Sequence, residues 1–160
     1  MAFLRRPSQD LRRWALLQRY DIPDLVDPSA TYLTRWRLVE TPWFALFLHA
    51  IRRPDADRHL HNHPWRRFTT LILRGGYDEA VPAGDPFAAD GRRVMRTWTR
   101  GSAHTVRLGD YHAIANLHRT PTWTLMFVGH RCADWGYATP QGFVPHGDYH
   151  LNRTDEPSPA

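Results

Sequence analysis

At 160 residues, with 42% hydrophobic and 12% aromatic side chains, the chain has the size and composition of one globular domain. Its single cysteine, Cys132, excludes an internal disulfide and fits a reducing compartment, and no apolar run is long enough to span a membrane. The net charge of +5 comes from 21 basic residues, all of them arginine, which are spread along the chain without a nucleic-acid-binding motif. We therefore expect a cytoplasmic protein whose partner is neither a membrane nor a nucleic acid.

The first predicted element is a helix over residues 9–20, with Ser8 as its candidate N-cap. The apolar residues of this helix share one face, which we expect to pack against the outside of a sheet: Leu11, Trp14, Ala15 and Leu17. Turn-forming residues at 21–24 end the helix, and a second turn at 27–29 leads into the strands.

Short runs of strand-forming residues at close spacing follow, which is typical of an antiparallel sandwich or barrel. We expect strands at residues 32–39, 43–51, 68–73, 93–99, 104–108, 111–117, 123–128 and 135–138. The nearly continuous apolar character of residues 43–51 suggests burial on both faces. Residues 81–91 are rich in Pro, Gly, Ala and Asp, and we expect them to form a mobile loop at the barrel's edge. Four large aromatic residues are predicted to lie in the core: Trp36, Trp43, Trp123 and Phe127.

Three histidines, His59, His61 and His63, occupy alternate positions just before one of these strands. Because alternate residues of a strand point to the same face, their imidazoles can converge on one point. Neutral imidazole is a common ligand for zinc, iron, copper and nickel, and the remaining ligand must come from a different strand. The pattern therefore suggests a metal site, with its remaining ligand sought within residues 101–116.

Both stretches resemble the two sequence motifs of the cupins. The first motif, G-x5-H-x-H-x3-4-E-x6-G, places its histidines on His61 and His63 and its last glycine on Gly75. The second, G-x5-P-x-G-x2-H-x3-N, is matched in spacing by Gly101, Gly109, His112 and Asn116. The resemblance implies an all-β fold, a small double-stranded β-helix barrel. It divides the chain into an N-terminal helix and turn at 1–30, the cupin barrel at 31–151 and a disordered tail at 152–160.

The chain departs from the motifs at Asp55, Phe68 and Arg107, which replace a glycine, a glutamate and a proline. The glutamate is a metal ligand in many cupins. What remains resembles the three-histidine sites of cysteine-dioxygenase-like cupins, with His61, His63 and His112 as ligands. Phe68 would then form an aromatic wall in place of a fourth ligand, although core packing explains this residue equally well. A closer resemblance, to small uncharacterised bacterial and phage cupin-like proteins, carries no known function.

The resemblance implies an Fe(II)-dependent dioxygenase that acts on a small organic molecule. One alternative is a redox-inert ion such as Zn or Mn, or Ni, at the same site, in an isomerase, lyase or hydrolase. Another is a barrel that only binds a ligand. No general acid or base accompanies the histidines in either motif, which disfavours the redox-inert enzyme. Cupins often pair through their sheets, so a homodimer is a further hypothesis.

The other histidines are expected to have ordinary roles. His59 is assigned to the surface or to a position behind the ligands, and His104 to structural hydrogen bonding. His146 and His150 are interpreted as solvated tail residues, with closure over the site as the alternative. Four arginines are candidates to pair with an acidic substrate, although each is more often a surface residue: Arg35, Arg37, Arg74 and Arg107.

Overall fold

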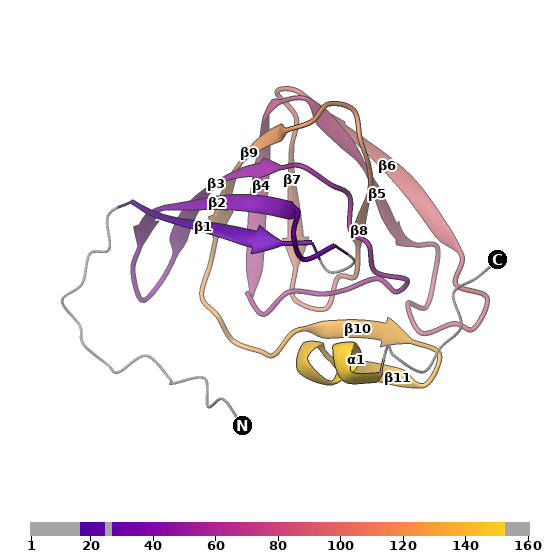
Figure 1. Ribbon diagram of the computed structural model, residues 1–160. Coiled ribbons are helices and arrows are strands. Elements are labelled where there is room, and N and C mark those ends of the chain that lie inside the picture. Colours follow the sequence, from indigo (N-terminus) through magenta and orange to yellow (C-terminus); the bar gives the residue numbers. More distant parts are fainter. Residues whose placement is uncertain (1–16, 25–26, 153–160) are drawn as a thin grey trace.

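The computed structural model describes residues 17–24 and 27–152, except for the side chains of residues 150–152. This part of the chain forms eleven strands and one short helix (Figure 1). They are β1 (Gln18–Pro23), β2 (Thr31–Glu40), β3 (Ala45–Ile51), β4 (Arg67–Arg74), β5 (Gly76–Pro82), β6 (Arg93–Thr99), β7 (Ala103–Arg107), β8 (Ala113–Leu117), β9 (Thr122–Val128), β10 (Gly136–Thr139), β11 (Gly142–Pro145) and α1 (His146–Asn152). The expected all-β class is confirmed. No helix among the described residues is long and apolar enough to cross a membrane.

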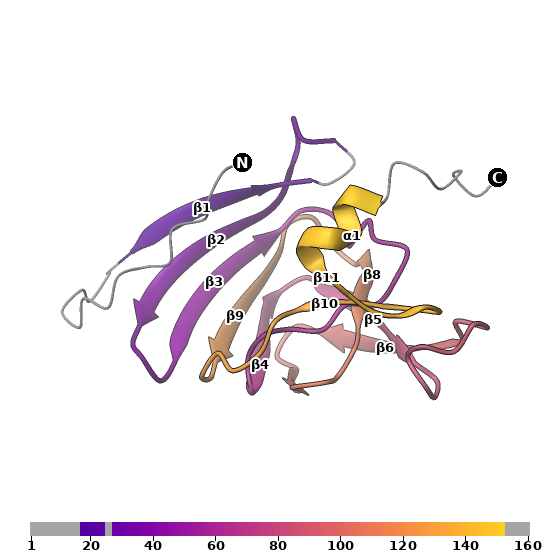
Figure 2. The same ribbon diagram turned by 90° about the horizontal axis from the view of Figure 1, so that it is seen from below.

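The strands form two antiparallel sheets and a separate hairpin. The larger sheet has the order β1-β2-β3-β9-β4-β7, and the smaller has the order β6-β5-β8. Figures 1 and 2 show the two sheets inclined towards each other, with the β10–β11 hairpin and α1 at one end of the space between them. Tyr77 of β5 joins a buried cluster with Leu33, Ile51 and Ile72 of the larger sheet. The two sheets therefore share one interior, as expected for a barrel.

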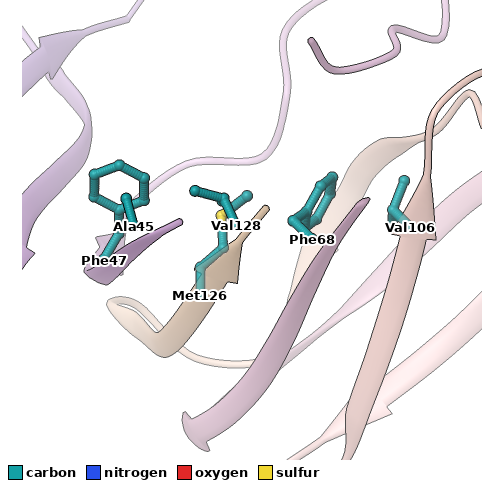
Figure 3. Close-up of a cluster of buried hydrophobic side chains, with 6 residues drawn as sticks. All are labelled: Ala45, Phe47, Phe68, Val106, Met126 and Val128. Carbon is teal, nitrogen blue, oxygen red and sulfur yellow. The ribbon is translucent and has the colours of Figure 1, made fainter. Parts of the chain in front are cut away.

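Alternate side chains of the larger sheet point into this interior and form a buried cluster. Phe47 pairs with Met126, and Phe68 pairs with both Val106 and Val128, so that these residues share one face. Figure 3 shows this row of side chains projecting from β3, β9, β4 and β7 to the same side. The cluster consists of Ala45, Phe47, Phe68, Val106, Met126 and Val128.

The described part of the predicted N-terminal helix is a strand, so the prediction was wrong for residues 18–20. β1 pairs antiparallel with β2 from Gln18 opposite Arg37 to Ile22 opposite Leu33. The open edge of β2 satisfies the backbone groups of β1 directly, and this tertiary pairing overrides a weak helical pattern. Residues 9–16 lie outside the described part of the chain. The short helix in the structure is α1, near the C-terminus, and it includes Asn152, which was assigned to the tail.

Two of the four aromatic residues that were predicted to lie in the core are exposed. Trp43 lies in the turn before β3 and is 75% exposed, and Phe127 is 46% exposed. Phe127 points outward because it alternates with the buried residues Met126 and Val128 on β9. Trp36 and Trp123 are half-buried and stack on each other, with ring centroids 5.4 Å apart. The predicted burial of residues 43–51 on both faces therefore does not hold over their first residues.

Candidate metal centre

The histidine-bearing segment is not a regular strand, contrary to expectation. It is held by an isolated antiparallel bridge, in which the backbone N–H of His61 donates to His112 O at 3.0 Å and that of His112 donates to His61 O at 2.9 Å. On its other side, the backbone N–H of Asn62 donates to Gly136 O at 3.0 Å. Pro64 has no N–H and interrupts any longer ladder. The bridge sets His61 directly opposite His112.

The structure brings His61, His63 and His112 together. One ring nitrogen of each lies within 4.8 Å of the others. The Nε2 atoms of His63 and His112 are 2.7 Å apart. His61 and His112 are only 9% and 8% exposed. Three imidazoles from two separate segments thus converge in a largely buried place.

Burial keeps two of these rings neutral at physiological pH. It lowers the pKa of His61 to about 4, against the opposing effect of Asp55. Burial, together with the proximity of His112 and His61, holds the pKa of His63 well below its usual value. Neutral imidazole is the form that ligates metals.

The donor set fits a divalent metal ion. Nδ1 of His61 is buried and has no hydrogen-bond partner among the described residues. A buried nitrogen without a partner is unfavourable unless a ligand satisfies it. Imidazole nitrogens suit Fe(II), Zn, Ni and Cu, whereas Mn prefers oxygen donors. His61, His63 and His112 are therefore the residues that would hold the ion.

Aromatic rings enclose one side of the cluster. The ring of Phe68 meets that of His63 edge to face, with centroids 4.7 Å apart, and lies 5.9 Å from that of His112. Trp65 stacks on His63 at 5.6 Å. Phe68 is also a member of the buried cluster in Figure 3. Phe68 therefore packs in the core and also lies against two of the histidines.

Glu79 is a site residue that the sequence analysis did not identify. Its Oε1 lies 2.5 Å from Nδ1 of His112, and its Oε2 accepts a hydrogen bond from Nε1 of Trp98 at 2.8 Å. Although burial raises the pKa of Glu79, the hydrogen bonds from His112 and Trp98 bring the net pKa below its usual value. These two donors favour the ionised form of Glu79, whose side chain is only 2% exposed. The one signal in the sequence was a pair of acidic residues, Asp78 and Glu79, within an otherwise apolar strand.

His59 and His104 lie outside the three-histidine group. Nδ1 of His59 is 3.0 Å from the hydroxyl of Tyr149, which lies on α1. His104 is buried, and its Nε2 lies 3.1 Å from the hydroxyl of Tyr77. The ring of His104 also stacks on Trp98 at 4.2 Å. These contacts fit the non-ligand roles that were predicted for both histidines.

His146 is not a solvated tail residue. It is the first residue of α1, and its ring stacks on that of Trp135 with centroids 3.8 Å apart. Trp135 in turn lies 6.2 Å from the ring of His61. The start of α1 therefore covers the aromatic residues beside the histidines. The side chain of His150 lies outside the described part of the chain.

Among the four candidate arginines, Arg35 is directed into the barrel. Its Nε donates to Nε2 of His49 at 3.0 Å, and its guanidinium lies 5.0 Å from the ring centroid of Phe47. Burial lowers the pKa of Arg35. Arg37 instead pairs with Glu40 and Gln18 at the sheet edge. Arg74 and Arg107 are exposed at strand ends.

No protein-family model matches the sequence, and no curated protein matches it. Solved structures do resemble the fold. The polyketide cyclase RemF from Streptomyces resistomycificus superposes with a TM-score of 0.55 at 16% identity, over 86% of this chain and 87% of that one. An uncharacterised conserved protein with a double-stranded β-helix domain from Klebsiella pneumoniae subsp. pneumoniae has a TM-score of 0.51 at 17% identity, over 73% and 96%.

A third similar structure is HppE, crystallised as its Fe(II) form with the alternative substrate (S)-1-HPP. Its TM-score is 0.51 at 13% identity, over 76% of this chain. The chain spans 60% of the length of HppE. At these identities the similarity establishes the architecture, a barrel of two facing antiparallel sheets.

Proposed function

Given that the chain has the double-stranded β-helix fold of the cupins, we propose that it is an Fe(II)-dependent dioxygenase for a small acidic molecule. The observation that carries this proposal is the convergence of ring nitrogens from His61, His63 and His112 to within 4.8 Å of one another. The similarity of the fold to HppE, which has been crystallised with Fe(II), supports the choice of metal.

Fe(II) would supply one-electron chemistry with dioxygen, which no side chain of the protein can supply. Among the described residues, the candidate group consists of three imidazole donors and includes no carboxylate. Phe68 occupies the position at which the cupin motif has its glutamate. Its apolar ring packs against His63 and covers this side of the histidine cluster. The protein would therefore hold the ion with imidazole alone, and Phe68 would keep water away from one side of it.

Arg35 supports an acidic substrate. Its guanidinium contacts Phe47, which packs in the same cluster as Phe68, and Phe68 contacts His63. A desolvated guanidinium gains a charge-assisted, bidentate hydrogen bond when a carboxylate or phosphonate binds it. Thr124 lies opposite His49 on the same face, and its buried hydroxyl has no hydrogen-bond partner among the described residues. Arg35 and Thr124 together offer donors for such an anion.

Metal analysis of the purified protein, followed by oxygen uptake over a panel of carboxylates and phosphonates, tests the proposal. We expect iron in about one-to-one ratio and uptake that depends on both iron and one class of acid. His63→Ala should abolish both. A bound metal without oxygen uptake would contradict the dioxygenase. It would favour the redox-inert alternatives, among them a cyclase such as RemF, whose fold this chain shares, or a ligand-binding barrel.

The partner that we propose for the protein itself is a second copy of the chain. The outer face of the larger sheet carries exposed aromatic rings, among them Phe127, which stacks on Phe44 at 5.3 Å. Exposed apolar patches of this kind are typical of protein interfaces. Light scattering at micromolar concentration should give a dimer mass, and Phe127→Arg should give a monomer. A wild-type monomer would contradict the homodimer.

A further inference from the structure

We infer that Glu79 is the positioning residue of the metal centre, holding His112 in the one tautomer and orientation that can ligate the ion. This inference rests on the metal site proposed above. It assigns to β5 a carboxylate that neither histidine motif contains. It also places negative charge behind His112, whereas the cupin motif places its glutamate at the position of Phe68.

The contact between Glu79 and His112 selects the tautomer. An ionised carboxylate can only accept hydrogen bonds, so Nδ1 of His112, 2.5 Å from Oε1, must carry the proton. In the neutral imidazole, the lone pair is then on Nε2. That nitrogen faces Nε2 of His63 at 2.7 Å, inside the candidate group. The hydrogen bond to Glu79 therefore aims the lone pair of His112 at the place where the ion would bind.

Glu79 is itself held in place by neighbouring strands. Nε1 of Trp98, on β6, donates to its second oxygen at 2.8 Å. Trp98 stacks on His104 of β7, and His104 is hydrogen-bonded to Tyr77 of β5. Each side chain in this series is fixed by a hydrogen bond or a ring contact, so Glu79 has little freedom to rotate. A rigid carboxylate transmits its orientation to the imidazole that donates to it.

The surroundings of Glu79 leave His112 as its closest basic neighbour. The basic groups within 4.0 Å of it among the described residues are both histidines, His112 at 2.5 Å and His104 at 3.9 Å. A divalent ion on the far side of His112 would bind the opposite nitrogen of the same imidazole. The contact with Glu79 and the bond to the ion would therefore fix this ring together.

Glu79→Gln tests this coupling with little change of volume. In glutamine an NH₂ donor replaces one of the two carboxylate oxygens, so the acceptor that faces either Trp98 or Nδ1 of His112 is lost. We expect the affinity for Zn(II) or Co(II), measured by chelator competition, to fall about 10- to 100-fold. In ¹⁵N NMR spectra, His112 of the wild type should show the Nδ1–H tautomer, and that of the variant a mixture.

The matched control is Asp78→Asn, which removes a negative charge from the adjacent residue. Asp78 points the other way and bonds to Thr97 and His118, so metal affinity and the His112 signals should stay within twofold of wild type. Trp98→Phe keeps the charge of Glu79 but removes one of its anchors. It should give a smaller loss of affinity, and it serves as the second variant if Glu79→Gln does not fold.

The failure of this inference is distinguishable from that of the metal site. If His63→Ala abolishes metal binding but Glu79→Gln changes neither affinity nor tautomer, Glu79 is not a positioning residue and the metal site stands. If His63→Ala leaves metal binding unchanged, the metal site itself is wrong. An equal loss of affinity in Asp78→Asn and Glu79→Gln would show a general charge effect and overturn the specific role of Glu79.

Discussion

His63 and His112 bring their Nε2 atoms within 2.7 Å of each other, although they lie 49 positions apart in the chain. The approach depends on the backbone bridge between His61 and His112, which aligns the two segments. Nδ1 of His112 lies 2.5 Å from Oε1 of Glu79, so Nε2 is the nitrogen of this ring that faces His63. Without metal, His63 can donate to this nitrogen, and with metal both nitrogens can bind the ion.

The first prediction concerns which histidines bind metal. His61→Ala should remove most of the bound metal, whereas His59→Ala should leave the metal content nearly unchanged, because His59 is directed towards Tyr149. Elemental analysis of both purified variants provides the measurement. The reverse pattern would show that the ligand register is shifted by two residues.

The second prediction concerns Phe68, which is 4% exposed and touches His63. Phe68→Glu introduces an unpaired buried carboxylate and should destabilise the metal-free protein by several kcal/mol, on the order of the cost of such a group. Added metal should reverse much of this loss, since the new carboxylate would lie beside the ion. Thermal melts with and without Zn(II) measure both effects, with Val106→Glu, in the same cluster, as the control. Equal destabilisation with and without metal would contradict a position beside the ion.

The third prediction is acid sensitivity of the metal-free protein. Burial lowers the pKa values of four histidines below the value of about 6.5 that they have when unfolded: His49, His61, His63 and His104. The unfolded chain therefore binds more protons below pH 6.5, so stability should fall as the pH drops from about 7 towards 4, the pKa of His61. Each fully titrating site contributes up to about 1.4 kcal/mol per pH unit.

Denaturant unfolding at several pH values measures this dependence. A stability that is constant between pH 7 and pH 5 would show that these rings are not held neutral in the fold.

The fourth prediction concerns Arg35. Arg35→Met should weaken binding of an acidic ligand about 10- to 100-fold, in line with the loss of a charged hydrogen bond of roughly 1.5–3 kcal/mol. Arg107→Met is the matched control, because Arg107 is exposed at the end of β7. Isothermal titration with the acid found by the oxygen-uptake screen compares the two. Unchanged affinity in Arg35→Met would place the anion elsewhere.

The sequence by itself determined the fold class and the set of three histidines. Alternating apolar positions and frequent turns specify strands, because the period of two is a local property of the backbone. The motif spacing selected His61, His63 and His112. It fixes the position of each histidine within its own segment, and the fold that the motifs indicate brings the two segments together. The same local logic failed for residues 18–20, where the open edge of β2 decided the structure.

Only the tertiary structure decided which other groups meet these histidines. Glu79 lies 33 residues before His112, and the two come together because β5 pairs with β8, with Ala80 opposite Ala113. Arg35 is distinguished from three other candidate arginines by facing His49 across the β2–β3 ladder. Such contacts depend on pairings between distant segments, and the spacing of residues within a segment carries no information about them. The orientation of His112 is thus set by a carboxylate that no motif marks.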